Sequence, residues 1–247
     1  MELIRLVDWS YAACALTAVL IAVLYPAGSA IQDAGLKRRY RRMQLVTLVG
    51  AVVGAKLAFL FAELGWPMRP LTGLGDVVFS GRSITGGLLG GLFAAETARY
   101  LTGYPRPPND RFAAVLPFSV AVGRIGCLVA GCCRGLPWNG PWAVAYDDGV
   151  LRHPAQLYEG LFHVAAGFLF LRLVARGRMK GRVFSLYLVL YGVFRFLTEP
   201  LRETPKFFSG ASGYAILAVL MTAVGVIGVV LRTKRLPAPM SAAGVEA

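Results

Sequence analysis

Seven apolar stretches, each close to the length at which a helix crosses a bilayer, dominate this sequence. A bilayer core of about 30 Å is crossed by roughly 20 apolar residues in helical form. The stretches cover Trp9–Gln32, Met43–Phe61, Ser83–Tyr100, Phe112–Val129, Pro154–Ala175, Val183–Glu199 and Ala211–Leu231. Charged residues make up 16% of the chain, well below the roughly 25% of soluble domains. The sequence therefore predicts an all-α, polytopic integral membrane protein with seven transmembrane helices.

The apolar stretches leave no room for a separate soluble domain. We expect one membrane domain over residues 1–236 and a disordered tail at Pro237–Ala247. The first stretch is interpreted as a retained helix and not as a signal peptide, because no basic segment precedes it and a basic cluster follows it. The loops Glu63–Arg82 and Gly131–His153 are long enough to form small extracytoplasmic elements.

Basic residues are distributed unequally between the loops. Of the 26 Lys and Arg residues, 16 lie in alternate loops and the tail, at 37–42, 99–111, 172–182 and 232–235, and 7 lie on the opposite side. The positive-inside rule then predicts an N-terminus outside and a C-terminus in the cytoplasm. The net charge of +13 suits anionic lipid or nucleic acid. We expect no nucleic-acid partner, because the basic residues flank apolar stretches and no aromatic-basic recognition motif is present.

Polar side chains gather at one depth of the predicted bundle, in the outer halves of the stretches. Such side chains are costly in lipid and mark function by default. They are Lys56, Thr85, Arg124, Glu159, Arg195 and Glu199. Guanidinium groups bind phosphate oxygens through paired donors, so the pattern predicts a pocket for a phospholipid head group. The alternative is structural: Arg195 and Glu199, four residues apart, would form an ion pair, and Lys56 would reach the interface.

Three blocks of the sequence resemble the prolipoprotein diacylglyceryl transferase family. The first is Gly123-Arg124-Ile125-Gly126 with Gly135, the second spans residues 152–159, and the third spans residues 191–199 with Arg202. The resemblance implies transfer of a diacylglyceryl group from phosphatidylglycerol, or a related anionic phospholipid, to the cysteine thiol of a prolipoprotein or another thiol acceptor. It places this transferase at the outer face of a bacterial cytoplasmic membrane, where lipoprotein biosynthesis begins.

The resemblance also implies roles for individual residues. Catalytic roles fall to Arg124, Arg195, Glu199 and His153. Substrate-binding roles fall to Lys56, Thr85, Gly86, Gly123, Gly126, Cys127, Gln156, Tyr158, Glu159 and Arg202. Arg124 and Arg195 would bind the phosphate and stabilise charge on the departing phosphate ester. We expect no cofactor and no metal.

Departures from the family pattern leave the acceptor open. Cys127 and Ala130 stand where the family has asparagine, Cys132 where it has glutamate, and Thr85 where it has the histidine of a His-Gly-Gly segment. Threonine cannot serve as the base for a thiol with a pKa of about 8.5. Either another group activates the thiol, or the acceptor is a small thiol, a hydroxyl or a lipid. A lipid-binding or lipid-translocating protein without chemistry is the remaining alternative, and the absence of a visible internal repeat favours the enzyme.

The four cysteines show no paired Cys-x-x-Cys zinc spacing. Cys132 and Cys133 are expected to pack as small residues at a helix end. A chemically active Cys127 or Cys132 is the alternative, and it would require a lowered thiol pKa, with Arg124 and Arg134 as the nearest sources of positive charge.

Overall fold

The computed structural model describes residues 33–64, 81–104, 109–207 and 210–234, together with a few positions between 13 and 20. The predicted stretch Trp9–Gln32 therefore falls almost wholly outside the described residues. Most of the Glu63–Arg82 loop and the whole tail Pro237–Ala247 also lie outside them.

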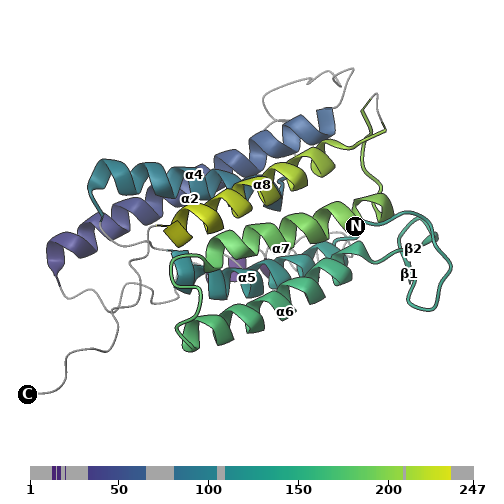
Figure 1. The fold of residues 1–247 in the computed structure, drawn as a ribbon. Coiled ribbons are helices and arrows are strands. Elements are labelled where there is room, and N and C mark those ends of the chain that lie inside the picture. Colours follow the sequence, from purple (N-terminus) through teal and green to yellow (C-terminus); the bar gives the residue numbers. More distant parts are fainter. Residues whose placement is uncertain are drawn as a thin grey trace, which may run out of the picture.

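Six α-helices of the described chain run alternately in opposite directions in one elongated bundle (Figure 1). They are α2 (Ala34–Leu64), α4 (Ile84–Thr102), α5 (Asn109–Val129), α6 (Ala155–Ala175), α7 (Val183–Thr198) and α8 (Gly213–Lys234). The short 3-10 turn η1 (Glu199–Leu201) follows α7, as expected of a helix that meets Pro200.

A small hairpin marks one end of the bundle, called here the hairpin end (Figure 1). Its strands β1 (Val144–Ala145) and β2 (Leu151–Arg152) pair antiparallel, with Val144 opposite Arg152. The hairpin lies within the predicted loop element Gly131–His153. It forms the one sheet among the described residues, and isolated β-bridges, such as that between Gly135 and Arg202, lie beside it.

Five helices of the described chain are long and apolar enough to cross a membrane. They cover Ala34–Glu63, Phe112–Val129, Ala155–Ala175, Val183–Leu201 and Gly213–Thr233. Helix α4 covers the predicted Ser83–Tyr100 stretch but is not among them, because its glycines and the charged Glu96 and Arg99 lower its mean hydropathy. A polytopic helical architecture is thus confirmed, whereas the total of seven helices stays a prediction.

The helices pack mainly as sequential pairs: α2 against α4, α5 against α6 and α7 against α8. Glycines let α2 and α4 approach closely, since a Cβ on Gly54 would lie 2.5 Å from the Gly86 oxygen and 2.7 Å from the Gly90 Cα. This agrees with the close packing that small residues permit between membrane helices. Gly86, assigned above to substrate binding, therefore lies in a helix interface.

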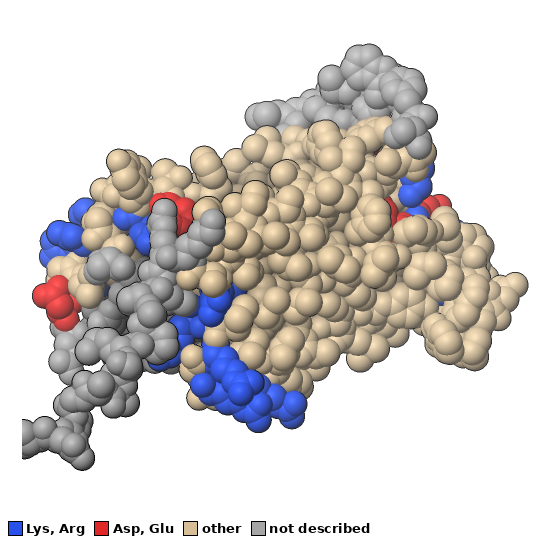
Figure 2. All heavy atoms as spheres, in the orientation of Figure 1, with Lys and Arg blue, Asp and Glu red and all other residues tan. Residues whose placement is uncertain are grey.

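Charge is divided between the two ends of the bundle. Figure 2 shows most of the visible Lys and Arg atoms gathered at the end opposite the hairpin, where α2 begins and where α6 and α7 are joined. The middle of the visible face is almost free of charge. This banded surface is what a bilayer-spanning bundle requires.

Candidate active site

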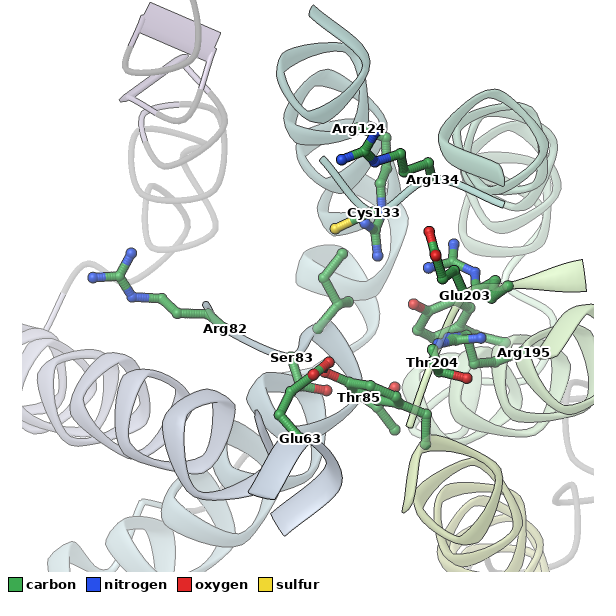
Figure 3. A pocket seen from close by; sticks show the side chains of 14 residues that line it. Glu63, Arg82, Ser83, Thr85, Arg124, Cys133, Arg134, Arg195, Glu203 and Thr204 are labelled. Atoms are coloured by element: carbon green, nitrogen blue, oxygen red, sulfur yellow. The ribbon is translucent and has the colours of Figure 1, made fainter. Parts of the chain in front are cut away.

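A pocket opens at the hairpin end, between the beginnings of α4 and α8 and the ends of α5 and α7 (Figure 3). Its lining comprises Glu63, Arg82, Ser83, Ile84, Thr85, Arg124, Cys133, Arg134, Tyr191, Arg195, Arg202, Glu203, Thr204 and Tyr214. Four of the predicted site residues are among them: Thr85, Arg124, Arg195 and Arg202. The pocket thus draws together side chains that are far apart in the sequence.

One buried carboxylate organises two of the pocket arginines. Glu159, which is 0% exposed, accepts a hydrogen bond from Arg124 Nη2 at 2.6 Å and another from Arg202 Nη2. The Tyr191 hydroxyl donates to the same carboxylate. Removing one partner of a buried ion pair leaves an uncompensated charge. Glu159 therefore holds both guanidinium groups in place at the wall of the pocket.

A second buried carboxylate holds the third arginine. Arg195 Nη1 donates to Glu199 Oε2, so the ion pair predicted from the four-residue spacing is confirmed. Glu199 Oε1 accepts from the Thr204 hydroxyl at 2.6 Å and from the Ser212 hydroxyl. The Arg195 guanidinium also lies 5.3 Å from the centre of the Tyr214 ring, within cation–π range.

These charges leave a positive surplus. Three buried guanidinium groups (Arg124, Arg195 and Arg202) face two buried carboxylates (Glu159 and Glu199). Burial lowers the pKa of the Arg202 guanidinium, although the neighbouring Glu159 acts in the opposite direction. A desolvated site with excess positive charge favours an anion, and paired guanidinium donors suit phosphate oxygens.

The structure places two predicted residues in the hairpin region and not in the pocket lining. The His153 ring stacks on Trp138 with 4.3 Å between ring centres, and its Nδ1 lies 3.1 Å from the Tyr158 hydroxyl oxygen. Trp142 Nε1 donates to the same hydroxyl at 2.8 Å. His153 was predicted as catalytic and Tyr158 as substrate-binding. Both belong to an aromatic cluster in the hairpin region, because the loop after Gly135 folds back along residues 151–153, and their predicted roles stay predictions.

Gln156 is fully buried and braces the turn that follows α5. Its amide nitrogen donates to the Cys132 carbonyl oxygen, and its amide oxygen accepts from the Tyr146 hydroxyl at 2.8 Å. The residue therefore supports the lining at Cys133 without being part of it.

Three further predicted residues also lie outside the lining. Lys56 Nζ donates to the Gly81 carbonyl oxygen at 3.4 Å. A Cβ placed on Gly123 would lie more than 4 Å from every atom outside its own stretch of helix. Gly126 is buried within α5. The glycines of the first family-like block thus shape α5 near Arg124 and do not line the pocket.

Sequence reasoning missed ten of the fourteen lining residues, among them two tyrosines and one cysteine. Tyr191 was visible as the first residue of the third family-like block, but its bond to Glu159 depends on tertiary packing. Cys133 lines the pocket, and hydrogen bonds with Cys127 and Cys132 lower the pKa of its thiol. The sequence feature that could have pointed to Cys133 is its position directly after Cys132 at the end of a predicted helix.

The fold and the pocket together define a class: a helical integral membrane protein with an arginine-rich pocket near one end. A family model described as "Prolipoprotein diacylglyceryl transferase" matches residues 4–231. The chain therefore belongs to the prolipoprotein diacylglyceryl transferase family, and the resemblance of the three sequence blocks is confirmed.

Individual relatives carry the same description. The chain is 29% identical over 223 residues to the "Phosphatidylglycerol--prolipoprotein diacylglyceryl transferase" of Clostridium tetani, covering 83% of this chain and 85% of that one. It is 35% identical over 204 residues to the protein of the same name from Solidesulfovibrio magneticus, covering 77% of this chain and 75% of the relative.

Proposed function

We propose that this protein transfers the diacylglyceryl group of phosphatidylglycerol to the cysteine thiol of a prolipoprotein. Membership of the family supports the reaction, and the names of the relatives favour this acceptor over a small thiol, a hydroxyl or a lipid. The observation that carries the proposal is the surplus positive charge of the buried arginine cluster. A lipid with an anionic head group is the substrate that this charge suits.

The arginines act on the phosphate. Arg124 and Arg195 bind its oxygens, with Arg202 beside them, and they stabilise the charge that builds up as the bond from the glycerol carbon to the phosphate oxygen breaks. The acceptor sulfur attacks that carbon, which leaves a thioether and releases glycerol phosphate. Glu159 and Glu199 are positioning residues, because each holds guanidinium groups through hydrogen bonds and neither lines the pocket.

The membrane placement follows from the charge asymmetry. In this proposal seven helices cross a bacterial cytoplasmic membrane, the N-terminus and the hairpin end face outward, and the basic end faces the cytoplasm. Sixteen basic residues against seven support this orientation. Residues 1–236 form the membrane domain, and the tail Pro237–Ala247 is outside it. The pocket then lies at the depth of outer-leaflet head groups.

A defined reaction tests the proposal. Purified protein is mixed with phosphatidylglycerol and a peptide that carries a lipobox cysteine, and mass spectrometry detects the diacylglyceryl thioether. Phosphatidylcholine, which has no net charge, serves as the control lipid and should give no product. Equal transfer from both lipids would contradict selection of a net-anionic head group by the surplus positive charge of the arginine cluster.

Substitution of Arg195 tests the site itself. Loss of one contact made in the transition state costs about 2.7–4 kcal/mol, so Arg195→Ala should lower turnover about a hundred- to thousandfold. Arg195→Lys should restore little, because it keeps the charge but loses the two-pronged donor geometry. Arg178→Ala, on an exposed arginine at the basic end, is the matched control and should leave turnover unchanged. Normal turnover in Arg195→Ala would reduce Arg195 to a structural partner of Glu199.

A further inference from the structure

Three cysteine thiols converge at the edge of the pocket. Cys127 lies in the last turn of α5, and Cys132 and Cys133 follow in the turn after it. Their three sulfur atoms all lie within 4.8 Å of one another. Cys127 is partly buried, whereas Cys132 and Cys133 are exposed, so the cluster is open to small ligands from the hairpin end.

The backbone builds this cluster at a conformational cost. Gly131 and Cys133 both have positive φ, at +63° and +58°, and the left-handed region is unfavourable for a residue with a Cβ. The Cys132 amide donates to the Cys127 carbonyl oxygen at 3.1 Å, and Gln156 holds the Cys132 carbonyl. Strained backbone conformations are often found at functional sites, where the surrounding structure enforces them. The turn therefore brings the sulfurs together although their spacing matches no common zinc motif.

Three thiols in this arrangement match the ligand set of zinc. Zinc prefers sulfur ligands at about 2.3 Å in tetrahedral geometry, which places the sulfurs about 3.8 Å apart. The observed cluster is close to that size. Catalytic zinc sites have three protein ligands and keep the fourth position for water or substrate. Three thiolates and one Zn²⁺ sum to one negative charge, and the Arg124 Nη1, 4.0 Å from the Cys127 sulfur, is a neighbouring positive group.

The cluster lies beside the substrate pocket. Cys133 lines that pocket, and its side chain lies next to Arg124 (Figure 3). Thr85, from the start of α4, lines the same pocket and stands where the family resemblance implies a histidine base. The pocket therefore has phosphate-binding groups and a thiol cluster side by side, but Thr85 supplies no base.

We infer that Cys127, Cys132 and Cys133 bind a zinc ion whose fourth position takes the acceptor thiol. This inference rests on the proposed transfer to a thiol, and it supplies the activation that Thr85 cannot provide. A thiol that coordinates zinc is deprotonated by the metal. The cysteines that replace polar residues of the family pattern are then part of the chemistry and not only packing residues.

The acceptor thiol binds zinc and releases its proton to water. An electron pair of the zinc-bound sulfur attacks the glycerol carbon of phosphatidylglycerol, and the bond from that carbon to the phosphate oxygen breaks. The oxygen keeps the bonding electrons and leaves as glycerol phosphate, held by Arg124 and Arg195. The thioether is a neutral, weaker ligand and dissociates, and the zinc ion is neither oxidised nor reduced.

Metal binding can be tested without activity. The full chain, purified in detergent under a phosphine reductant and without chelators, should bind one Zn²⁺, measured by elemental analysis and by competition with a chromophoric chelator. Cys132→Ser and Cys133→Ser should lose this ion. Cys14→Ser, which alters the one cysteine outside the cluster, is the matched control and should keep it. Absence of bound zinc in the unaltered chain, or zinc that persists in Cys133→Ser, would overturn the site.

Thiol protection gives a second measurement on the unaltered protein, which avoids variants that fail to fold. Zn²⁺ should protect the three cluster thiols from alkylation, as read by mass spectrometry, and leave Cys14 reactive to the same degree. Equal alkylation of all cysteines with and without Zn²⁺ would overturn the site. A disulfide between any two cluster cysteines in protein isolated from membranes would also overturn it.

The role of the metal in the reaction needs an activity measurement. A free thiol with a pKa of about 8.5 is only about 3% ionised at pH 7. Removing zinc should therefore lower turnover of the lipobox peptide at least tenfold, with recovery on adding stoichiometric Zn²⁺. Zinc binding with unchanged turnover after chelation would overturn the assigned role. Zinc binding by a protein that never forms the thioether would instead refute the proposed function, while the alkylation result still decides the metal site.

Discussion

Replacing Glu159 by glutamine tests whether one buried carboxylate holds the site together. The substitution keeps the side-chain volume and removes the charge that Arg124 and Arg202 share. The surplus positive charge of the buried cluster would rise from one to two. Removing one partner of a buried ion pair costs about 3–5 kcal/mol, because an uncompensated charge remains. Glu159→Gln should therefore lower the free energy of unfolding by about that amount.

Thermal unfolding of the purified protein in detergent measures this change. For a chain of this length, 1 kcal/mol corresponds to roughly 2–4 °C in Tm, so Glu159→Gln should unfold at least about 6 °C earlier. Glu203→Gln is the matched control, since Glu203 pairs with Arg152 at 3.1 Å but keeps 57% of its side chain exposed. Exposed pairs contribute about 0–1 kcal/mol. Equal Tm shifts for the two variants would refute the reasoning from burial.

Two further predictions address helix packing and membrane orientation. Gly54→Leu should destabilise the protein by roughly 1–3 kcal/mol, because even a Cβ there would lie 2.5 Å from a backbone oxygen of α4. Gly123→Leu, with open space around its Cβ position, is the control and should change Tm little. A larger loss of Tm in Gly123→Leu than in Gly54→Leu would contradict the packing. In chains whose four native cysteines are replaced by serine and that carry one introduced cysteine, an impermeant thiol reagent added outside cells should label position 139 and leave position 39 unlabelled. Arg39 and Asn139 are both exposed, so the reverse pattern would place the pocket at the cytoplasmic face.

The helices were predictable from sequence because their apolar lengths and flanking charges report directly on a bilayer. The Arg195–Glu199 pair was predictable for a similar reason, since four residues of helix place two side chains on one face. The bond between Arg124 and Glu159 was not predictable from local pattern, because it depends on how α5 packs against α6. The family resemblance brought both residues into the candidate site, but it could not say that they bind each other.

The differences between the predicted site and the observed pocket lining arise largely in the loop 131–153. His153 was predicted as catalytic because it stands in a family-like block, whereas the folded loop stacks it on Trp138. The cysteines were expected to pack, and their spacing gave no hint of a cluster. Their convergence depends on left-handed backbone at Gly131 and Cys133. The conformation at Cys133 could not be predicted, because a cysteine in a sequence does not indicate a positive φ.

The ion pair between Arg124 and Glu159 also bears on how the protein enters the membrane during synthesis. An unpaired arginine costs about 2.5–3.5 kcal/mol at the centre of an inserting helix. Helix α7 has its counter-charge close by, because Glu199 follows Arg195 by one turn. The counter-charge of Arg124 in α5 is Glu159 in α6, which lies 35 residues further along the chain and is therefore synthesised later. We therefore expect α5 to remain at the translocation channel until α6 emerges and the two helices to partition into lipid together.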